Sequence, residues 1–270
     1  MTAPLLEVRR LRKLYQGHGR AAVAIGDVSF SCGDSELVCI VGPSGAGKTT
    51  LLRCVAGLIA PSAGEVVLGG VRVAGPPSGM AVVFQDYGRS LFPWLTVERN
   101  VALPLAQRGV PRAQLHGRAR DALGEVGLGE VLGAYPWQLS GGMQQRVAIA
   151  RALAYEPRLL LMDEPFAAVD AQARAELEDL TRSVWRRHGV TVLLVTHDID
   201  EAVYLGQRVL VLSAAPTTVI DDVAIDLPAE RDQLATRSLP RFAELRTRVY
   251  GHIRQAVQHR AGAPAGPGSG

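Results

Sequence analysis

Short apolar runs separated by polar residues set the pattern along this chain. Three of these runs, at residues 37–41, 159–162 and 190–195, end in glycine or polar residues. Runs of this length are typical of strands that are buried on both faces of a parallel sheet. The polar groups that follow such strands meet at the sheet edge where α/β proteins bind ligands. The pattern therefore predicts a mostly parallel core sheet with its chemistry at one edge.

Helical periodicity occupies the intervals between these runs. Alternation of strands and helices favours an α/β fold. Residues 8–30 and 66–73 instead alternate like antiparallel strands, so an antiparallel β subdomain is expected beside the parallel sheet. The segments that we expect to be helical are residues 48–58, 143–155, 171–188 and 198–205.

The pattern also suggests how the chain is divided. Residues 86–156 hold helical and loop patterns with little strand signal, so we expect an inserted helical subdomain there. A main domain is predicted over residues 5–240. An amphipathic pattern at 242–258 predicts a C-terminal helix within 241–260, and the Gly- and Pro-rich residues 261–270 predict a flexible tail.

Composition narrows the class of protein. Of the 270 residues, 47% are hydrophobic and 20% charged, and the formal net charge is +3. These values exclude a fibrous or disordered chain, and they fall short of the clustered basicity of a dedicated nucleic-acid binder. Three cysteines without metal-ligand spacing favour a reducing cytoplasm. No apolar run approaches the roughly 18 residues of a membrane span, and we expect no signal peptide.

A glycine-rich loop follows the first apolar run. Residues 42–49 read Gly-Pro-Ser-Gly-Ala-Gly-Lys-Thr and match the G-x-x-x-x-G-K-[ST] pattern between a strand and a helix. In this pattern backbone N–H groups and the helix N-terminus surround phosphate oxygens, while the lysine reaches the β- and γ-phosphates. A turn ending in a solvated lysine is the alternative. The predicted nucleotide-binding residues here are Gly42, Pro43, Ser44, Gly45, Ala46, Gly47, Lys48, Thr49 and Thr50.

Two adjacent carboxylates end the second apolar run. Asp163 is predicted to hold Mg²⁺, together with the Thr49 hydroxyl, and Glu164 to act as the base for an attacking water. An ordinary solvated loop would also begin with such residues, but the phosphate loop upstream favours the catalytic interpretation.

A single histidine follows the third apolar run. His197 comes directly after the strand predicted at 190–195, at the same sheet edge as the carboxylates. We expect it to contact the γ-phosphate or the water. A structural histidine at a strand end is the alternative.

A further motif makes a family resemblance explicit. Residues 139–146 read Leu-Ser-Gly-Gly-Met-Gln-Gln-Arg, with Ser140 as the expected N-cap of a helix. Together with the phosphate loop, Gln85, the acid pair, Asp170 and His197, in this order, the motif resembles the signature of ATP-binding cassette (ABC) ATPases. The resemblance implies an ABC cassette of the P-loop NTPase class that binds ATP and Mg²⁺.

The resemblance also implies residue roles. Tyr15 looks like the aromatic residue that stacks on adenine, and Gln85 like the glutamine that senses Mg²⁺ and water. The signature residues would face the γ-phosphate of an ATP held by a second subunit, so that catalysis requires a dimer. These signature residues are Ser140, Gly141 and Gly142.

Two positions depart from the usual family pattern. Met143 stands where many cassettes have glutamine, and residues 167–170 read Ala-Ala-Val-Asp rather than Ser-Ala-Leu-Asp. The serine, the glycines and Asp170 are retained, so the predicted ATPase activity stands.

The same resemblance suggests a particular kind of transporter. Residues 75–85, 91–97 and 226–231 resemble the nitrate/sulfonate/taurine importer ATPases, which implies separate permease subunits, an extracytoplasmic solute-binding protein and a peripheral position on the cytoplasmic membrane face. Phe92 and Trp94 would receive a permease helix, or else belong to the core of the helical insert. The alternatives are an ABC clamp that acts on nucleic acid or the ribosome, and a P-loop kinase.

Overall fold

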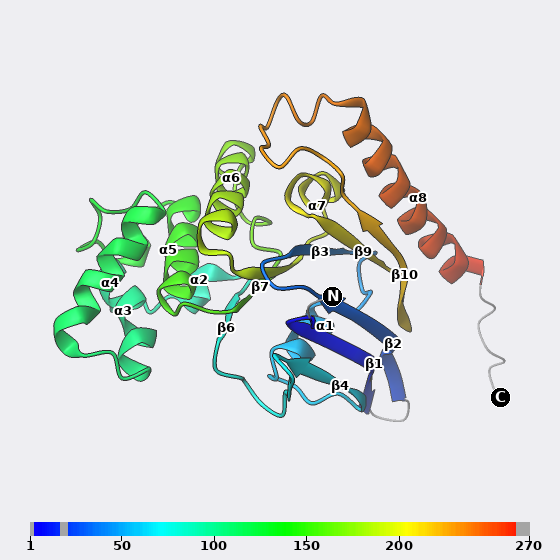
Figure 1. The fold of residues 1–270 in the computed structure, drawn as a ribbon, viewed down its shortest axis with the longest axis horizontal. Coiled ribbons are helices and arrows are strands. Elements are labelled where there is room, and N and C mark those ends of the chain that lie inside the picture. Colours follow the sequence, from blue (N-terminus) through cyan, green and yellow to red (C-terminus); the bar gives the residue numbers. More distant parts are fainter. Residues whose placement is uncertain (1–2, 17–20, 263–270) are drawn as a thin grey trace. The chain divides into compact units, whose positions relative to one another are not determined.

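The computed structural model describes residues 3–16 and 21–262, which form two compact units that are treated separately here (Figure 1). The first unit draws on residues up to Cys32, on Val38–Gly75 and on the chain from Thr196 onward. The second comprises Gly33–Leu37 and Pro76–Val195. Most of the predicted tail at 261–270 lies outside the described residues.

The first unit contains an antiparallel layer that passes into a mixed sheet. β1 and β2 pair antiparallel with Leu6 opposite Cys32, and β4 pairs antiparallel with the other edge of β1. β10 lies parallel to β2 and antiparallel to β9, which in turn lies parallel to β3. The strands are β1 (Leu6–Gln16), β2 (Ala21–Cys32), β3 (Leu37–Val41), β4 (Ala63–Leu68), β5 (Val71–Arg72), β9 (Arg208–Leu212) and β10 (Thr217–Ala224).

Three helices belong to this unit, namely α1 (Lys48–Val55), α7 (Ile199–Leu205) and α8 (Pro240–Gly262). α8 runs beside β9 and β10 (Figure 1). Phe242, Leu245 and Val249 are almost completely buried, and their spacing of three and four residues places them on one face of that helix. Their burial fixes the α8 helix on the rest of the unit.

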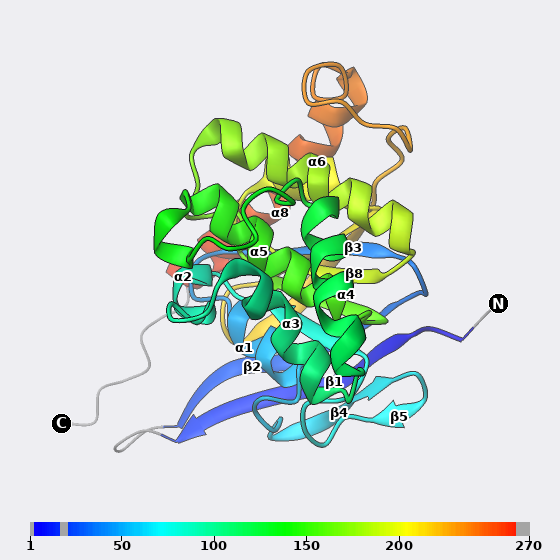
Figure 2. The same cartoon turned by 90° about the vertical axis from the view of Figure 1, so that its left-hand side faces the viewer.

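The second unit combines a parallel sheet with a group of helices. Its strands β6 (Met80–Val83), β7 (Leu159–Asp163) and β8 (Thr191–Val195) are parallel, with β7 in the middle. Every residue of β7 and β8 is buried, as expected for a sheet covered on both faces. The helices α3, α4 and α5 pack together (Figure 2). The helical elements are α2 (Tyr87–Ser90), α3 (Val97–Gln107), α4 (Arg112–Glu125), the short 3₁₀ helix η1 (Pro136–Gln138), α5 (Gly141–Ala154) and α6 (Ala171–His188).

The predicted fold class is confirmed, with its parallel strands, antiparallel layer and helical part. The helix expected at 171–188 has those bounds because Asp170 accepts a hydrogen bond from Ala173 N at its start and left-handed Gly189 ends it. The helix expected at 48–58 ends earlier, at Val55, and is followed by Gly57 with φ of 68°. The short strands β6 and β9 were not predicted.

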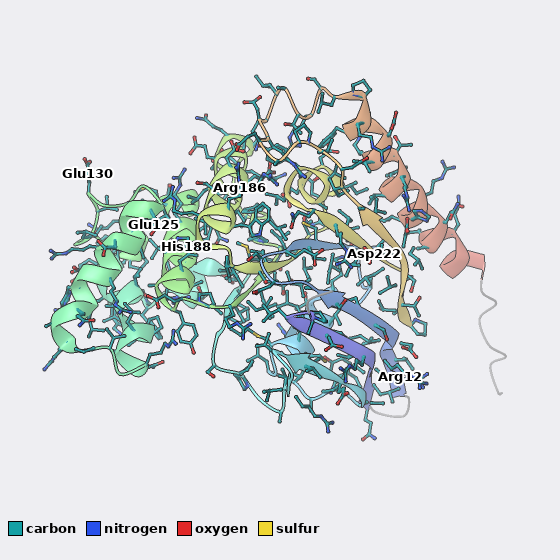
Figure 3. The ribbon with its side chains drawn as sticks, in the orientation of Figure 1. Arg12, Glu125, Glu130, Arg186, His188 and Asp222 are labelled. Atoms are coloured by element: carbon teal, nitrogen blue, oxygen red, sulfur yellow. The ribbon has the colours of Figure 1, made fainter. Side chains whose placement is uncertain are left out.

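Exposed ion pairs join neighbouring elements within each unit, and three of the residues that form them, Glu125, His188 and Asp222, are labelled in Figure 3. In the first unit Arg208 of β9 contacts both carboxylate oxygens of Asp222 on β10, at 3.0 and 2.7 Å. In the second unit His188 Nε2 lies 2.5 Å from Glu125 Oε2. Exposed pairs of this kind contribute about 0–1 kcal/mol each, so the buried strands dominate stability. None of the helices in the described part of the chain has the length and hydropathy that crossing a bilayer requires.

Candidate nucleotide-binding site

The glycine-rich loop connects β3 to α1, as predicted. Gly45 and Gly47 have φ of 75° and 74°, a backbone conformation that other residues adopt only with strain. A Cβ at Gly47 would also lie 3.0 Å from the carbonyl oxygen of Ala24. Glycine is therefore required at this point both by the backbone conformation and by the close approach of β2.

The side chain of Lys48 folds back over this loop. Only 7% of Lys48 is exposed, and its Nζ donates to Gly42 O at 2.9 Å and to Pro43 O at 3.2 Å. A lysine ammonium has three donors, and these two carbonyls accept from it. The loop thus has a positive charge at its centre rather than a lysine in solvent, which contradicts the simple-turn interpretation.

A buried threonine that was not predicted from the sequence holds the glycine-rich loop in place. Thr217, at the start of β10, is fully buried, and its Oγ1 donates to Ala24 O at 2.9 Å and also contacts Ala46 O. This hydroxyl ties the loop to β2 and β10. No motif pointed to it because it lies more than 150 residues from the loop in sequence.

Tyr15 lies near the first turn of α1. Its hydroxyl is 3.4 Å from Thr50 Oγ1, and Lys13 Nζ lies 5.4 Å from the centre of its ring. The Tyr15 residue is 42% exposed. An aromatic ring that is open to solvent next to the phosphate loop can receive another flat ring. Thr49, the predicted Mg²⁺ ligand, precedes Thr50 and is half-buried.

The two carboxylates stand at the end of β7. Asp163 is its last residue and is 5% exposed, whereas Glu164 follows it and is half-buried. Glu164 has φ of 45°, and its N–H donates to Val195 O on β8 at 2.8 Å. A left-handed glutamate costs conformational energy of order 1–3 kcal/mol, and such strain concentrates at functional sites. The backbone therefore turns directly after β7.

Gln85 and Glu164 are brought together although 79 residues separate them. The Nε2 of Gln85 donates to Oε2 of Glu164 at 3.4 Å. Gln85 follows β6, whose neighbour in the parallel sheet is β7. The carboxyl ends of both strands thus present their polar side chains at one edge.

His197 is an exposed side chain on a firmly held backbone. The preceding residue, Thr196, is buried, and its Oγ1 donates to Glu201 Oε2 at 2.6 Å. The same Oγ1 accepts from Asp198 N at 3.0 Å, and Asp198 caps α7. Sequence reasoning missed Thr196 and Glu201, which fix the backbone on both sides of the histidine.

The signature residues begin α5. The Oγ of Ser140 accepts from Met143 N at 3.3 Å, so Ser140 is the N-cap that the sequence predicted. Gly141 and Gly142 form the first positions of the helix. A Cβ at Gly142 would lie 3.2 Å from Ala173 Cβ, which leaves little room for a larger residue. Ser140 itself is exposed.

In the segment at residues 91–97, Trp94 lies on the surface and Phe92 lies beside a hollow. Trp94 is 70% exposed, so the alternative that placed it in the helical core is wrong for this residue. The buried Asn100 side chain bonds to both backbone groups of Phe92 and to the carbonyls of Leu95 and Thr96. Beside Phe92 lies a hollow of about 290 Å³ whose lining includes Met80, Val82, Phe92, Leu103, Pro104 and Tyr155.

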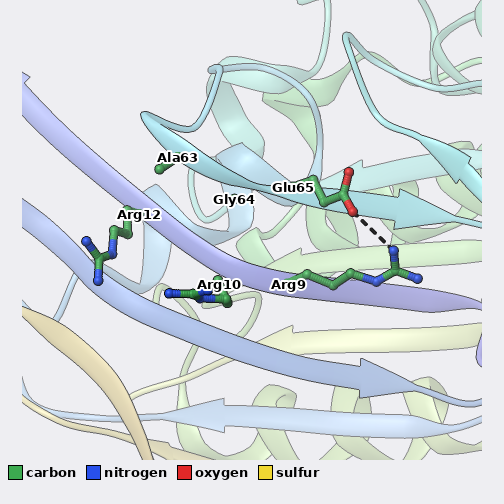
Figure 4. A pocket seen from close by; sticks show the side chains of 6 residues that line it. All are labelled: Arg9, Arg10, Arg12, Ala63, Gly64 and Glu65. Atoms are coloured by element: carbon green, nitrogen blue, oxygen red, sulfur yellow. Dashed lines mark hydrogen bonds and ion pairs between the residues drawn. The ribbon is translucent and has the colours of Figure 1, made fainter.

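An arginine-lined hollow of about 470 Å³ lies on the first unit, at a bulge of β1 (Figure 4). Arg9 is paired with Glu65 at 3.1 Å, and Arg12 with Asp27 at 3.6 Å. Arg10 is 4.0 Å from Asp27 as well. These carboxylates compensate the positive charge of the three arginines.

A buried lysine lies at the end of a glycine-rich loop between a strand and a helix, and two carboxylates stand at the end of another strand. This combination defines a P-loop nucleoside triphosphatase. Residues 25–167 match the model of the ABC transporter family, so the chain belongs to that family and is an ABC transporter ATPase.

Relatives extend this similarity over most of the chain. A taurine import ATP-binding protein of Pseudomonas putida is 43% identical, over 95% of this chain and 99% of the relative. A nitrate import ATP-binding protein of Synechocystis sp. is 42% identical, over 86% and 87%.

A solved structure is similar as well. This is the dimeric, post-hydrolysis state of an ATP-binding cassette bound to ADP and Pi. It has a TM-score of 0.72 and 32% identity, over 82% of this chain and 98% of that one.

Proposed function

We propose that this chain is the ATP-hydrolysing subunit of an importer for a small solute of the taurine, sulfonate or nitrate group. The near full-length similarity to relatives named for taurine and nitrate import supports the importer. The 3.4 Å hydrogen bond between Gln85 and Glu164 is the main observation that supports ATP hydrolysis by this chain. The working domain is residues 5–240, with a helical subdomain at 86–156 and an accessory helix at 241–260.

ATP binds on the glycine loop. The loop N–H groups and α1 attract the phosphate oxygens, and Lys48 leaves its loop carbonyls to pair with the β- and γ-phosphates. The exposed ring of Tyr15 stacks on the adenine. The residues assigned to binding in this subunit are Tyr15, Gly42, Pro43, Ser44, Gly45, Ala46, Gly47, Lys48, Thr49 and Thr50.

Thr49, Gln85 and Asp163 are proposed as the protein ligands of Mg²⁺. Their hydroxyl, amide and carboxylate oxygens are the donors that this cation prefers, and few of them are needed because it keeps several waters. Asp163 is the last residue of β7 and is 5% exposed, so its carboxylate is held in place at the end of that strand. When bound, Mg²⁺ neutralises charge on the β- and γ-phosphates.

Hydrolysis uses the strand-end residues. Glu164 accepts a proton from the attacking water, and Gln85, already hydrogen-bonded to that carboxylate, orients the water. His197, whose backbone is fixed by Thr196 and Asp198, contacts the γ-phosphate with its exposed imidazole.

A second cassette completes the site. The exposed Ser140 caps α5, and Gly141 and Gly142 are its first residues, where the N–H groups have no acceptor within the helix; such a helix start suits the γ-phosphate of an ATP held by another copy. Asp170, the cap of α6, belongs to the loop that links the two sites. The similar solved structure is a dimer, which supports this arrangement.

The remaining proposed partners are the permease subunits in the membrane and a solute-binding protein. Permease subunits dock on the exposed Trp94 and the hollow beside Phe92, which places the subunit peripherally on the cytoplasmic membrane face. An extracytoplasmic solute-binding protein acts through the permease.

Reconstitution tests the proposed transport function. The chain is co-purified with its permease, and ATP turnover in vesicles is measured with a solute-binding protein loaded with taurine or nitrate. Stimulation by one loaded binding protein supports the importer. Turnover stimulated by DNA or ribosomes, and indifferent to permease, would show the non-transport clamp instead.

A further inference from the structure

Two aromatic side chains stand exposed just before the signature serine. Trp137 is 70% exposed and Tyr135 is 37% exposed. Their ring centroids lie 6.0 Å apart, with an angle of 14° between the ring planes. The rings form a stacked pair at the surface, and we refer to Tyr135 and Trp137 as the aromatic pair.

The backbone beneath the aromatic pair is fixed. Pro136 is buried in η1, and Leu139 is 8% exposed, so these two buried side chains anchor the short segment on either side of Trp137. Tyr135 N donates to Gln138 Oε1 at 2.8 Å. Gln144 of α5 donates its Nε2 to Leu139 O at 3.1 Å. Anchors inside the segment and on α5 therefore hold the two rings in place.

A fixed aromatic surface of this kind suits protein association. Tryptophan and tyrosine are the residues that most often dominate interface energies, because they bury a large area with few rotatable bonds. Little conformational entropy remains to be lost here, since Tyr135 and Trp137 already stack on each other. The aromatic pair lies close to the signature, with Trp137 three residues and Tyr135 five residues before Ser140.

We propose that the aromatic pair is covered by a second copy of this chain when ATP binds, and that Trp137 is a main contributor to the ATP-dependent dimer. This inference rests on the proposed function, which directs Ser140 toward the ATP of the other copy. Since Trp137 is joined to Ser140 by a rigid segment, the copy that reaches Ser140 also approaches Trp137. The similar solved cassette, which is dimeric, supports this choice of partner.

The test uses Glu164→Gln as the parent, because loss of the proposed base should stop hydrolysis and leave ATP bound. Dimerisation is measured by sedimentation over a range of protein concentrations, with and without ATP. Trp137→Ala should weaken the ATP-dependent dimer about 10-fold or more, whereas Trp137→Phe should stay within about 3-fold of the parent. ATP binding at protein concentrations too low for dimers should be the same in all variants.

Trp94→Ala provides a matched control. Trp94 is also 70% exposed, lies in the same unit and contacts a second aromatic ring, Phe92, at 5.3 Å between centroids. Its loss should leave the dimer of the isolated chain unchanged.

The outcomes distinguish this inference from the function on which it rests. A parent that dimerises with ATP, together with a Trp137→Ala variant that dimerises equally well, would overturn the role of Trp137 and leave the composite site intact. Equal weakening by Trp94→Ala would overturn it too, because the effect would then be unspecific. A parent that stays monomeric with saturating ATP would overturn the composite site itself and the aromatic pair with it.

Discussion

The amide of Gln85 donates to the carboxylate of Glu164 at 3.4 Å, across two neighbouring parallel strands. The two residues follow β6 and β7, so the sheet itself sets their separation. Glu164 adopts a left-handed backbone conformation there, which the hydrogen bond from its N–H to Val195 O helps to hold. This arrangement supports the proposed roles of Glu164 as the base and of Gln85 in orienting the water.

Removal of the proposed base should separate binding from hydrolysis. Glu164→Gln keeps the size of the side chain but cannot accept the water proton, so we expect ATP turnover to fall about 10²- to 10⁴-fold. ATP binding should persist, and an ATP-bound dimer should accumulate. Steady-state phosphate release and sedimentation with ATP measure the two effects. Turnover at the level of the unmodified chain would refute the assignment of Glu164.

The loop lysine should control affinity for nucleotide. Lys48→Ala removes a buried ammonium that the loop carbonyls now hold, and charged hydrogen bonds of this type are worth about 1.5–3 kcal/mol. ATP affinity should therefore fall roughly 10- to 100-fold, as measured by equilibrium dialysis. Arg72→Ala serves as a control, because Arg72 is an exposed basic residue of the same unit that is paired with Glu65 at 3.9 Å. Unaltered ATP affinity in Lys48→Ala would contradict the phosphate loop.

Ser140 has a structural role as the N-cap of α5 and a proposed catalytic role. A control substitution at another N-cap residue, Thr96, distinguishes the two roles. Ser140→Ala should cost about 1 kcal/mol of unfolding free energy through loss of the α5 cap, and should also reduce ATP hydrolysis at least 10-fold. Thr96→Ala removes the cap of α3, in which Thr96 Oγ1 accepts from Arg99 N at 3.3 Å, as Ser140 does from Met143. The control should lose similar stability and keep its hydrolysis. Equal hydrolysis in both variants would leave Ser140 as a cap alone.

Trp94 should matter for assembly rather than for chemistry. Because its side chain is exposed, Trp94→Ala should leave the unfolding free energy within about 0.5 kcal/mol of the unmodified chain. Co-purification with the permease should fall sharply, while the basal ATPase rate of the isolated chain stays unchanged. A parallel loss of basal rate and assembly would contradict a docking role.

The thiol of Cys54 should respond to pH in a predictable direction. Burial in α1 raises the pKa of Cys54 from 9.0 to about 11, because the thiolate is disfavoured away from water, although Lys13 opposes the shift. The Cys54 thiol therefore keeps its proton to a higher pH in the folded protein than in the unfolded chain. The resulting stability is fully present below pH 9 and is lost as the pH rises toward 11.

Two measurements test this direction. Iodoacetamide labelling of Cys54, followed by mass spectrometry, should stay slow in the folded protein at pH 9 and become fast in denaturant. The difference in unfolding free energy between the unmodified chain and Cys54→Ala should shrink between pH 9 and pH 11. Fast labelling of the folded protein at pH 9 would contradict the raised pKa.

Local patterns in the sequence were sufficient to predict the class of the protein and the elements around its motifs. The phosphate loop, the acid pair and the signature each lie within eight or fewer consecutive residues, and their meaning depends on backbone conformation over that span. The α6 helix was predicted with its observed bounds because Asp170 and Gly189 mark its ends by local hydrogen bonding and backbone preference.

Long-range packing decided what the sequence could not. No local sequence pattern indicates the support of the glycine loop by Thr217 or the hydrogen bond between Thr196 and Glu201 beside His197. The exposure of Trp94 and Trp137 cannot be predicted from a local pattern either. The partner of a side chain and its access to water depend on strands that fold against it from distant parts of the chain. The sequence by itself determined which residues could bind and cleave a nucleotide, and only the tertiary structure decided which of them are held rigid and which face outward, because burial is a property of the assembled sheets and helices.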